Sequence, residues 1–338
     1  MKVVYYDYGG AHSSVLAASL HTGALSGERR PTAAEIRRLP HFDQATPADH
    51  GRLTYIGDAQ PGVEVYVLGC RRYHTIARRA LRGIALAYGI PHDDLVMTDT
   101  LPGVNLAMRL GGVLSRGLGL VTIGRPLVAW GTRKGFLNIK RIVDRTRGEV
   151  ERRLTRVAQE RGVSPSPAPL ATRPGPKVLY HCYGSSHSSV VASAIHTRKL
   201  PVRRKPTPEE VLALPHFDRV SAKLLGTVFY IGDDRDGREV YIVGLATGKH
   251  ILVRAINDLV KSYGLPDGSL TMVNSLTAAN WLAKLGGFVS RGLGLPWWGR
   301  PLAVAGVLQR YYSFIRLVEG VVPRLSLDGR VSLPDNEQ

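Results

Sequence analysis

Cysteine is almost absent from this sequence, which contains only Cys70 and Cys182 among its 338 residues. The two positions do not correspond in the internal repeat described below, because Cys70 matches Leu245 and Cys182 matches Asp7. The cysteines of a disulfide framework would recur with the repeated unit, so a disulfide-stabilised secreted domain is excluded. We expect a chain from a reducing compartment, with a cytoplasmic localisation as the default.

Long apolar runs and metal-binding motifs are also missing. No uninterrupted apolar stretch reaches the roughly 20 residues of a membrane-spanning helix, and the first residues are typical of a β-strand rather than of a signal peptide. The chain contains neither His-Glu-x-x-His nor Cys-x-x-Cys, and His12 and His21 are too far apart along a helix to share an ion. We therefore expect no transmembrane segment and no metal site, and the sequence names no cofactor.

Acidic residues are scarce relative to basic ones: 27 Asp and Glu against 45 Lys and Arg give a formal net charge of +18. Residues 133–161 carry ten of the basic and four of the acidic side chains. Such an excess is typical of proteins that bind nucleic acid, an anionic membrane or acidic ligands, but an arginine-rich solvated surface has the same composition. The pair Arg71 and Arg72 becomes Ala246 and Thr247 in the second copy, so we assign it no part in a shared function.

Internal similarity is the strongest signal that is present. Two copies of one unit align without a gap at an offset of 175 residues, which predicts a tandem duplication. The recurring motifs are Lys-Val-x-Tyr at residues 2 and 177, His-Ser-Ser at 12 and 187, Leu-Pro-His-Phe-Asp at 39 and 214, Tyr-Ile-Gly-Asp at 55 and 230, and Ser-Arg-Gly-Leu-Gly-Leu at 115 and 290.

Strand and helix patterns alternate within each copy. Thr32 and Glu35 form a capping box that opens a short helix, and Thr207 and Glu210 repeat it. The pattern predicts two tandem copies of a three-layer α/β domain with a mostly parallel sheet and one β-hairpin, although it does not give the strand order. In the first copy, strands are expected at 3–8, 53–57, 64–69 and 95–98, and the longer helices at 15–21, 75–88 and 104–114.

The domain boundaries follow from the repeat and from composition. We place the first α/β repeat at residues 1–131 and the second at 177–306. Residues 132–176 form a basic helical extension followed by a Pro-rich linker. Residues 307–338 form a C-terminal helix and a frayed tail.

The strand-to-helix turn near residue 10 is the first candidate site. Ligands collect beyond the carboxyl ends of parallel strands, and a helix N-terminus there offers unpaired N–H groups to an anion. The alternative is structural, with Gly turning the chain, Ser13 or Ser14 capping the helix, and His12 binding a local carbonyl. The ligand-binding candidates are Gly9, Gly10, His12, Ser13 and Ser14 in the first copy, and Gly184, His187, Ser188 and Ser189 in the second.

Arg116 and Arg291 lie in the Ser-Arg-Gly-Leu-Gly segments and are the second candidate. A guanidinium on such a loop could bind an anion in bidentate fashion, or it could bind the carboxyl end of the preceding helix. The matched carboxylates include Asp43 and Asp218, which are common turn residues, and spacing does not connect them to His12. We expect Arg125 and Arg300, which precede proline, to be structural.

The turn of the second copy resembles the phosphate loop of low-molecular-weight tyrosine phosphatases. The strand 178–182 runs through Cys182 and Gly184 into a Ser-containing helix start, as the strand, nucleophilic cysteine and loop of that family do. The resemblance would make Cys182 a weak catalytic candidate. The loop arginine of that family falls on Ser188, however, and the first copy has Asp7 at the cysteine position.

Each copy as a whole resembles another family. The turn, Leu-Pro-His-Phe-Asp, Tyr-Ile-Gly-Asp and Ser-Arg-Gly-Leu-Gly together are similar to the uncharacterised bacterial family catalogued as domain of unknown function 3189. The resemblance covers each copy nearly end to end, although members of that family are usually single copies. It implies the domain boundaries and no established activity.

Two functional hypotheses follow. The preferred one is that a small phosphorylated or otherwise anionic ligand binds, and could be turned over, at two equivalent sites, with His12 and His187 at the turns and Arg116 and Arg291 closing over it. The alternative is a non-enzymatic interaction protein whose basic residues 133–161 dock on nucleic acid or on an anionic membrane surface.

Overall fold

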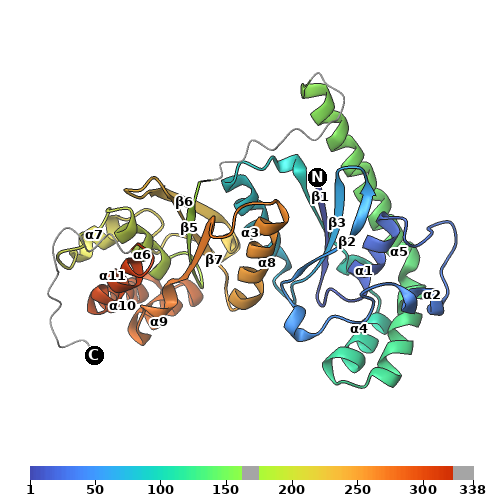
Figure 1. Ribbon diagram of the computed structural model, residues 1–338. Helices are drawn as coiled ribbons and strands as arrows, with labels where there is room; N and C mark the ends of the chain where they lie inside the picture. The colour runs from blue at the N-terminus through green and yellow to red at the C-terminus, as the bar shows by residue number, and fades with distance from the viewer. Residues whose placement is uncertain (162–174, 323–338) are drawn as a thin grey trace. The chain divides into compact units, whose positions relative to one another are not determined.

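The computed structural model describes residues 1–161 and 175–322 (Figure 1). The chain divides into two compact units, and each carries a four-stranded sheet. Most of the Pro-rich linker and the tail expected at 332–338 lie outside the described residues.

The first sheet contains β1 (Lys2–Asp7), β2 (Leu53–Gln60), β3 (Val63–Gly69) and β4 (Leu95–Asp99) in the order β2-β3-β1-β4. Strand β1 is parallel to both β3 and β4, while β2 is antiparallel to β3. The second sheet has the same pairing, with β5 (Lys177–Cys182), β6 (Val228–Asp233), β7 (Glu239–Gly244) and β8 (Leu270–Asn274) in the order β6-β7-β5-β8. Two repeated α/β units with mostly parallel sheets and one hairpin each are thereby confirmed.

Strand β1 lies in the middle of its sheet because it is apolar on both faces. Val3, Val4 and Tyr5 are fully buried, as expected for a parallel strand that is covered by helices on both sides. Helices α1 (Ser13–His21) and α5 (Val121–Arg161) cover one face, and α3 (His74–Ala87) covers the other (Figure 1). The connections that leave β1 and β3 therefore go to opposite faces, which opens a crevice at the carboxyl ends of these two strands.

The remaining helices follow the expected positions with local differences. The capping boxes at Thr32 and Thr207 are present and open α2 (Ala33–Arg38) and α7 (Pro208–Ala213). The Ser-Arg-Gly residues at 115–117 and 290–292, which were expected on a loop, belong instead to the π-helical turns Val113–Gly117 and Phe288–Gly292, and the following Leu-Gly-Leu residues are not helical. The other helices are α4 (Leu106–Gly112), α6 (Ser188–His196), α8 (Lys249–Ser262), α9 (Trp281–Gly287), α10 (Pro296–Gln309) and α11 (Tyr311–Glu319).

The basic segment 133–161 is part of α5, which continues without a break from Val121 to Arg161. Its apolar side chains Phe136, Ile139 and Val143 are buried in the core of the first unit. The helical spacing of these residues therefore reflects packing against the sheet and α1. In the second unit the corresponding stretch is divided at Arg310 into α10 and α11.

Candidate functional site

The turn after β1 is organised around the buried carboxylate of Asp7. Its Oδ1 accepts the Gly10 N–H at 2.5 Å, and its Oδ2 accepts the Ser13 hydroxyl at 2.7 Å and the Ser14 N–H at 2.9 Å. An acidic side chain at this position satisfies N–H groups that the first helical turn cannot pair within the helix. The expectation that Ser13 or Ser14 is the N-cap is wrong, because His12 is the N-cap residue and makes no side-chain cap bond.

Glycine lets the turn of repeat one approach the end of β3 closely. Gly10 has a φ of +69°, and a Cβ there would lie 2.7 Å from the backbone nitrogen of Gly69. A Cβ on Gly69 would in turn lie 2.5 Å from the carbonyl oxygen of Gly9. The chain segments that follow β1 and β3 are therefore held side by side at the crevice.

His12 belongs to a buried polar cluster whose other members come from distant segments. Its Nε2 lies 3.0 Å from Oδ1 of Asp43, and the hydroxyl of Ser115 donates to both oxygens of the same carboxylate, at 3.1 and 3.0 Å. The guanidinium of Arg125 lies 3.6 Å from Asp43 Oδ2. The fully buried Asp43 thus fixes the imidazole of His12 through one ring nitrogen.

The Leu-Pro-His-Phe-Asp motif explains how Asp43 reaches His12. His41 and Asp43 have φ values of +65° and +53°, a left-handed conformation that histidine and aspartate tolerate better than most residues. The intervening Phe42 is buried and packs edge-on against the His12 ring, with 5.4 Å between ring centroids. Left-handed residues outside glycine are costly and tend to mark functional sites.

The same cluster recurs in the second unit, with shorter serine and arginine contacts to the carboxylate. His187 Nε2 lies 3.1 Å from Asp218, Ser290 donates to both carboxylate oxygens at 2.7 and 2.8 Å, and Arg300 donates at 2.9 Å. Burial on its own would raise the pKa of Asp218, but the hydrogen bonds from His187, Ser290 and Arg300 lower it to about 2. Asp218 is therefore ionised at neutral pH.

Sequence reasoning found the histidine of each cluster and missed the rest. From the sequence alone, Asp43 and Asp218 are interpreted as common turn residues, and Arg125 and Arg300 as structural residues before proline. The cluster spans 72 positions between the aspartate and the serine, so only the tertiary fold brings its members together. The available signal was the recurrence of the same His, Asp and Ser in both copies.

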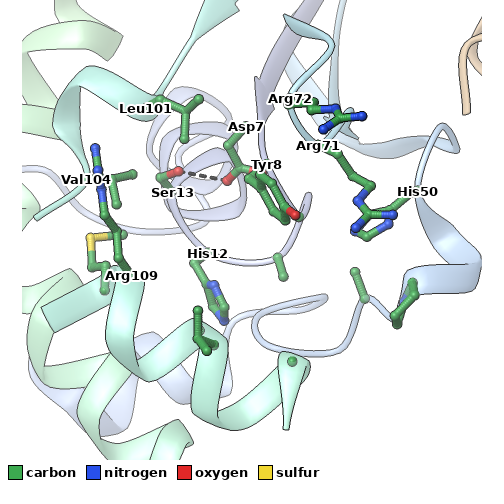
Figure 2. A pocket seen from close by; sticks show the side chains of 18 of the residues that line it. Asp7, Tyr8, His12, Ser13, His50, Arg71, Arg72, Leu101, Val104 and Arg109 are labelled. Atoms are coloured by element: carbon green, nitrogen blue, oxygen red, sulfur yellow. Dashed lines mark hydrogen bonds between the residues drawn. The ribbon is translucent and has the colours of Figure 1, made fainter. Parts of the chain in front are cut away.

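A cavity of about 700 Å³ opens beside this turn in the first unit (Figure 2). Asp7, His12 and Ser13 line it from the turn, and Arg71 and Arg72 line it from the segment that follows β3. Figure 2 shows Arg71 beside His50 on one side and Arg109 on the opposite side. The remaining lining includes His74 and the apolar side chains of Leu101, Val104, Met108 and Val113.

Comparison with known proteins identifies the repeated unit. The model of a family described as protein of unknown function (DUF3189) matches residues 2–148 and 177–322. The chain belongs to this family. The two matches confirm the tandem duplication, and no curated protein and no solved structure matches the chain.

The two DUF3189 repeats differ on the wall of the cavity. The positions of His50, Arg71 and Arg72 in repeat one correspond to Leu225, Ala246 and Thr247 in repeat two. The sequence alone indicates no part for Arg71 and Arg72 in a shared function, because the second copy lacks them. The structure places both beside the turn, since they follow the carboxyl end of β3.

The turn of the second DUF3189 repeat has a thiol where the first has a carboxylate. Cys182 Sγ accepts the Ser185 N–H at 3.1 Å and lies 3.1 Å from the Ser189 hydroxyl. Ser188 occupies the place of the phosphatase arginine, and its hydroxyl is bound by that of Ser275 at 3.3 Å. Gly184 lies close to Gly244 at the end of β7, as Gly9 lies close to Gly69 in repeat one: a Cβ on Gly244 would be 2.9 Å from the carbonyl carbon of Gly184.

The other predicted ligand-binding residues differ in their surroundings. Arg291 donates from Nε to the carbonyl of Val220 at 3.2 Å, so it binds the segment that follows Asp218. The side chain of Arg116 lies outside the described part of the chain. The Ser14 hydroxyl is buried in repeat one and has no hydrogen-bond partner among the described residues.

Several arginines of the basic helix are used within repeat one. Arg147 donates to the carbonyls of Leu20 and His21 at the end of α1. Arg153 is buried and bonds to Glu149 and to the carbonyl of His92. Arg156 pairs with Asp93 at 3.2 Å, so part of the positive charge of α5 is neutralised by its own repeat.

Within residues 1–161 and 175–322, no group of His, Cys, Asp and Glu side chains is arranged to hold a metal ion. A search of the same residues finds no helix with the length and apolar character needed to cross a bilayer.

Proposed function

We propose that repeat one binds a small phosphorylated or otherwise anionic ligand in the cavity beside the turn after β1. The observation that supports this most directly is the convergence of Arg71, Arg72 and Arg109 with three histidines on one cavity whose acidic lining residue is Asp7. The three guanidinium groups against one carboxylate leave an excess of two positive charges before any histidine is protonated. A phosphate or carboxylate is the ligand that such a wall attracts.

The shape of the cavity favours a small molecule. Its volume of about 700 Å³ lies within the roughly 300–1,000 Å³ typical of small-molecule sites. Leu101, Val104 and Met108 line the cavity together with the basic residues. We infer that the ligand combines an anionic group with an apolar or ring portion.

His12 and the arginines of the cavity wall would hold the anionic group. The Asp43 carboxylate orients the imidazole, and α1 directs the positive end of its dipole toward the turn. Asp7 already occupies the N–H groups of Gly10 and Ser14. The arginines, rather than the turn alone, would therefore supply most of the affinity.

Repeat two keeps the buried cluster of His187, Asp218 and Ser290 but lacks three of the basic groups. We therefore narrow the hypothesis of two equivalent sites to one principal site in repeat one. Both cysteines are buried and free.

Calorimetric titration of the full chain with inorganic phosphate and pyrophosphate tests this proposal. Charge-assisted hydrogen bonds contribute about 1.5–3 kcal/mol each, so the double variant Arg71→Gln, Arg72→Gln should weaken pyrophosphate binding at least about tenfold. The double variant Arg37→Gln, Arg38→Gln removes the same charge from α2 and is the matched control. His12→Ala should weaken binding, whereas His187→Ala should leave the principal site intact.

Two outcomes would refute the proposal. One is the absence of saturable binding of either anion by the wild-type chain. The other is an equal loss with the two double variants, which would show that only the overall charge matters. Tight, salt-sensitive binding of DNA that persists in His12→Ala would favour the alternative function of the basic helix.

A further inference from the structure

Each repeat exposes a helical hairpin with large apolar side chains on its surface. Hairpin one spans residues 106–134 and hairpin two spans residues 281–309; each consists of a short helix, the π-helical turn and the start of the next helix. The exposed residues of hairpin one include Leu106, Leu110, Val113, Leu118, Leu120 and Ile123. The matching positions of hairpin two are Trp281, Leu285, Phe288, Leu293, Leu295 and Trp298, and all six are exposed as well.

The degree of exposure is highest for tryptophan. Trp281 is 72% exposed, Trp298 is 74% exposed, and the adjacent Trp297 is 88% exposed. Single apolar residues on a surface need no explanation, but six matching positions that are exposed and apolar in both repeats indicate an interaction surface. These side chains are therefore expected to be covered by a partner.

The interior of each hairpin explains why its large side chains point outward. In hairpin one a Cβ on Gly111 would lie 2.5 Å from the backbone nitrogen of Val128, and a Cβ on Gly131 would lie 2.7 Å from that of Met108. In hairpin two Gly286 and Gly306 contact the backbones of Ala303 and Ala283 in the same way. Helices that pack through glycine leave no room for Leu or Trp between them, and such contacts are typical of helices in lipid.

The charge around the hairpins has one sign. Residues 100–143 and 268–318 contain no Asp and no Glu, although both stretches carry Lys and Arg. Arg109 and Lys284 are exposed at matching positions of the two hairpins. A surface that combines apolar side chains with cations alone complements an anionic lipid headgroup layer.

We propose that each hairpin can insert into the interface of an anionic lipid bilayer without crossing it. Residues 106–117 span about 18 Å if helical, little more than the roughly 15 Å of one leaflet. The hairpins can therefore bury their tips in the outer part of one leaflet. This agrees with the absence of a membrane-spanning helix from the described residues.

The order of side chains along α5 fits insertion of the tip of hairpin one into the outer part of one leaflet. The apolar Ile123 lies near the tip of hairpin one, and the half-exposed Trp130 follows two turns later. Arg133 and Lys134 come next, with the Lys134 ammonium 5.6 Å from the Trp130 ring. Tryptophan prefers the headgroup level, and Lys and Arg prefer the anionic surface above it. A second copy of this chain would cover the apolar side chains but would bring two cationic surfaces together.

Vesicle flotation of the full chain tests the proposal. Vesicles of phosphatidylcholine alone are compared with vesicles that contain an equal share of phosphatidylglycerol. We expect binding to the anionic vesicles, reduced by high salt, together with a blue shift of the tryptophan fluorescence as exposed indoles leave water. The double variant Trp297→Ser, Trp298→Ser should weaken binding at least tenfold, and Leu118→Ser, Leu120→Ser should weaken it as well.

The matched control is the double variant Tyr55→Ser, Tyr230→Ser. It removes two aromatic side chains that are 48% and 51% exposed and lie on the hairpin strands β2 and β6, and it should bind as the wild type does. The proposal is overturned if the wild-type chain does not bind anionic vesicles, or if the Trp and Tyr variants bind alike. It is also overturned if sedimentation velocity shows a stable oligomer that the Trp297→Ser, Trp298→Ser variant dissociates while vesicle binding is absent.

Discussion

Replacing Asp218 with Asn tests whether the buried cluster of repeat two stabilises the fold through its charge. The carboxylate accepts hydrogen bonds from His187, Ser290 and Arg300. These bonds lower its pKa from 3.8 to about 2 despite burial. At 1.36 kcal/mol per pKa unit, the ionised form contributes about 2–3 kcal/mol to the free energy of unfolding.

The shifted pKa of Asp218 also predicts how the free energy of unfolding changes with pH. The unfolded chain takes up the proton first as the pH falls, since its pKa is the higher of the two. The contribution of Asp218 is therefore fully present above about pH 4 and is lost as the pH falls toward 2. Asp218→Asn should be destabilised by about 2–3 kcal/mol at pH 7, and its deficit should shrink between pH 4 and pH 2.

Urea denaturation followed by far-UV circular dichroism measures both quantities. The matched control is Asp236→Asn, which removes a carboxylate that is 42% exposed and pairs with Arg238; an exposed pair of this kind contributes no more than about 1 kcal/mol. The reasoning is refuted if Asp218→Asn and Asp236→Asn are equally stable at pH 7. It is also refuted if the deficit of Asp218→Asn is the same at pH 2 as at pH 7.

Three further predictions concern other buried groups. Burial, and then the charge of Arg147, lowers the pKa of His21 from 6.5 to about 4, so the unfolding free energy should fall by about 3 kcal/mol between pH 6.5 and 4; His21→Phe should flatten this part of the pH profile. Gly299→Ala should cost at least about 1–3 kcal/mol, because its Cβ would collide with the Ser290 backbone. Gly320→Ala is the control, since its nearest neighbour would be 3.5 Å away. Ser290→Ala removes both hydrogen bonds to Asp218 and should lower the thermal midpoint by several degrees, an effect of about 1–3 kcal/mol; an unchanged midpoint would contradict the assigned role.

Local sequence signals predicted the elements of this fold well. The capping box of Thr32 and Glu35 specifies a helix start through contacts three residues apart. The strands and most helices follow from periodicity, because burial of one face or of both depends on neighbours along the same segment. The identity of the N-cap was not predictable in this way, since the Asp7 carboxylate takes over the role that Ser13 or Ser14 would play in an isolated helix.

The sequence by itself determined the duplication, the α/β class and the histidine at each turn. Each of these depends on residues that are close together in the sequence or that recur at the same positions of both copies. Only the tertiary structure decided which residues surround that histidine. The strand order places the end of β3 beside β1, which brings Arg71 and Arg72 to the cavity. The left-handed Asp43 reaches across 31 positions to His12. Glycine at the helix crossings turns the large side chains of the apolar stretches after residues 105 and 280 outward.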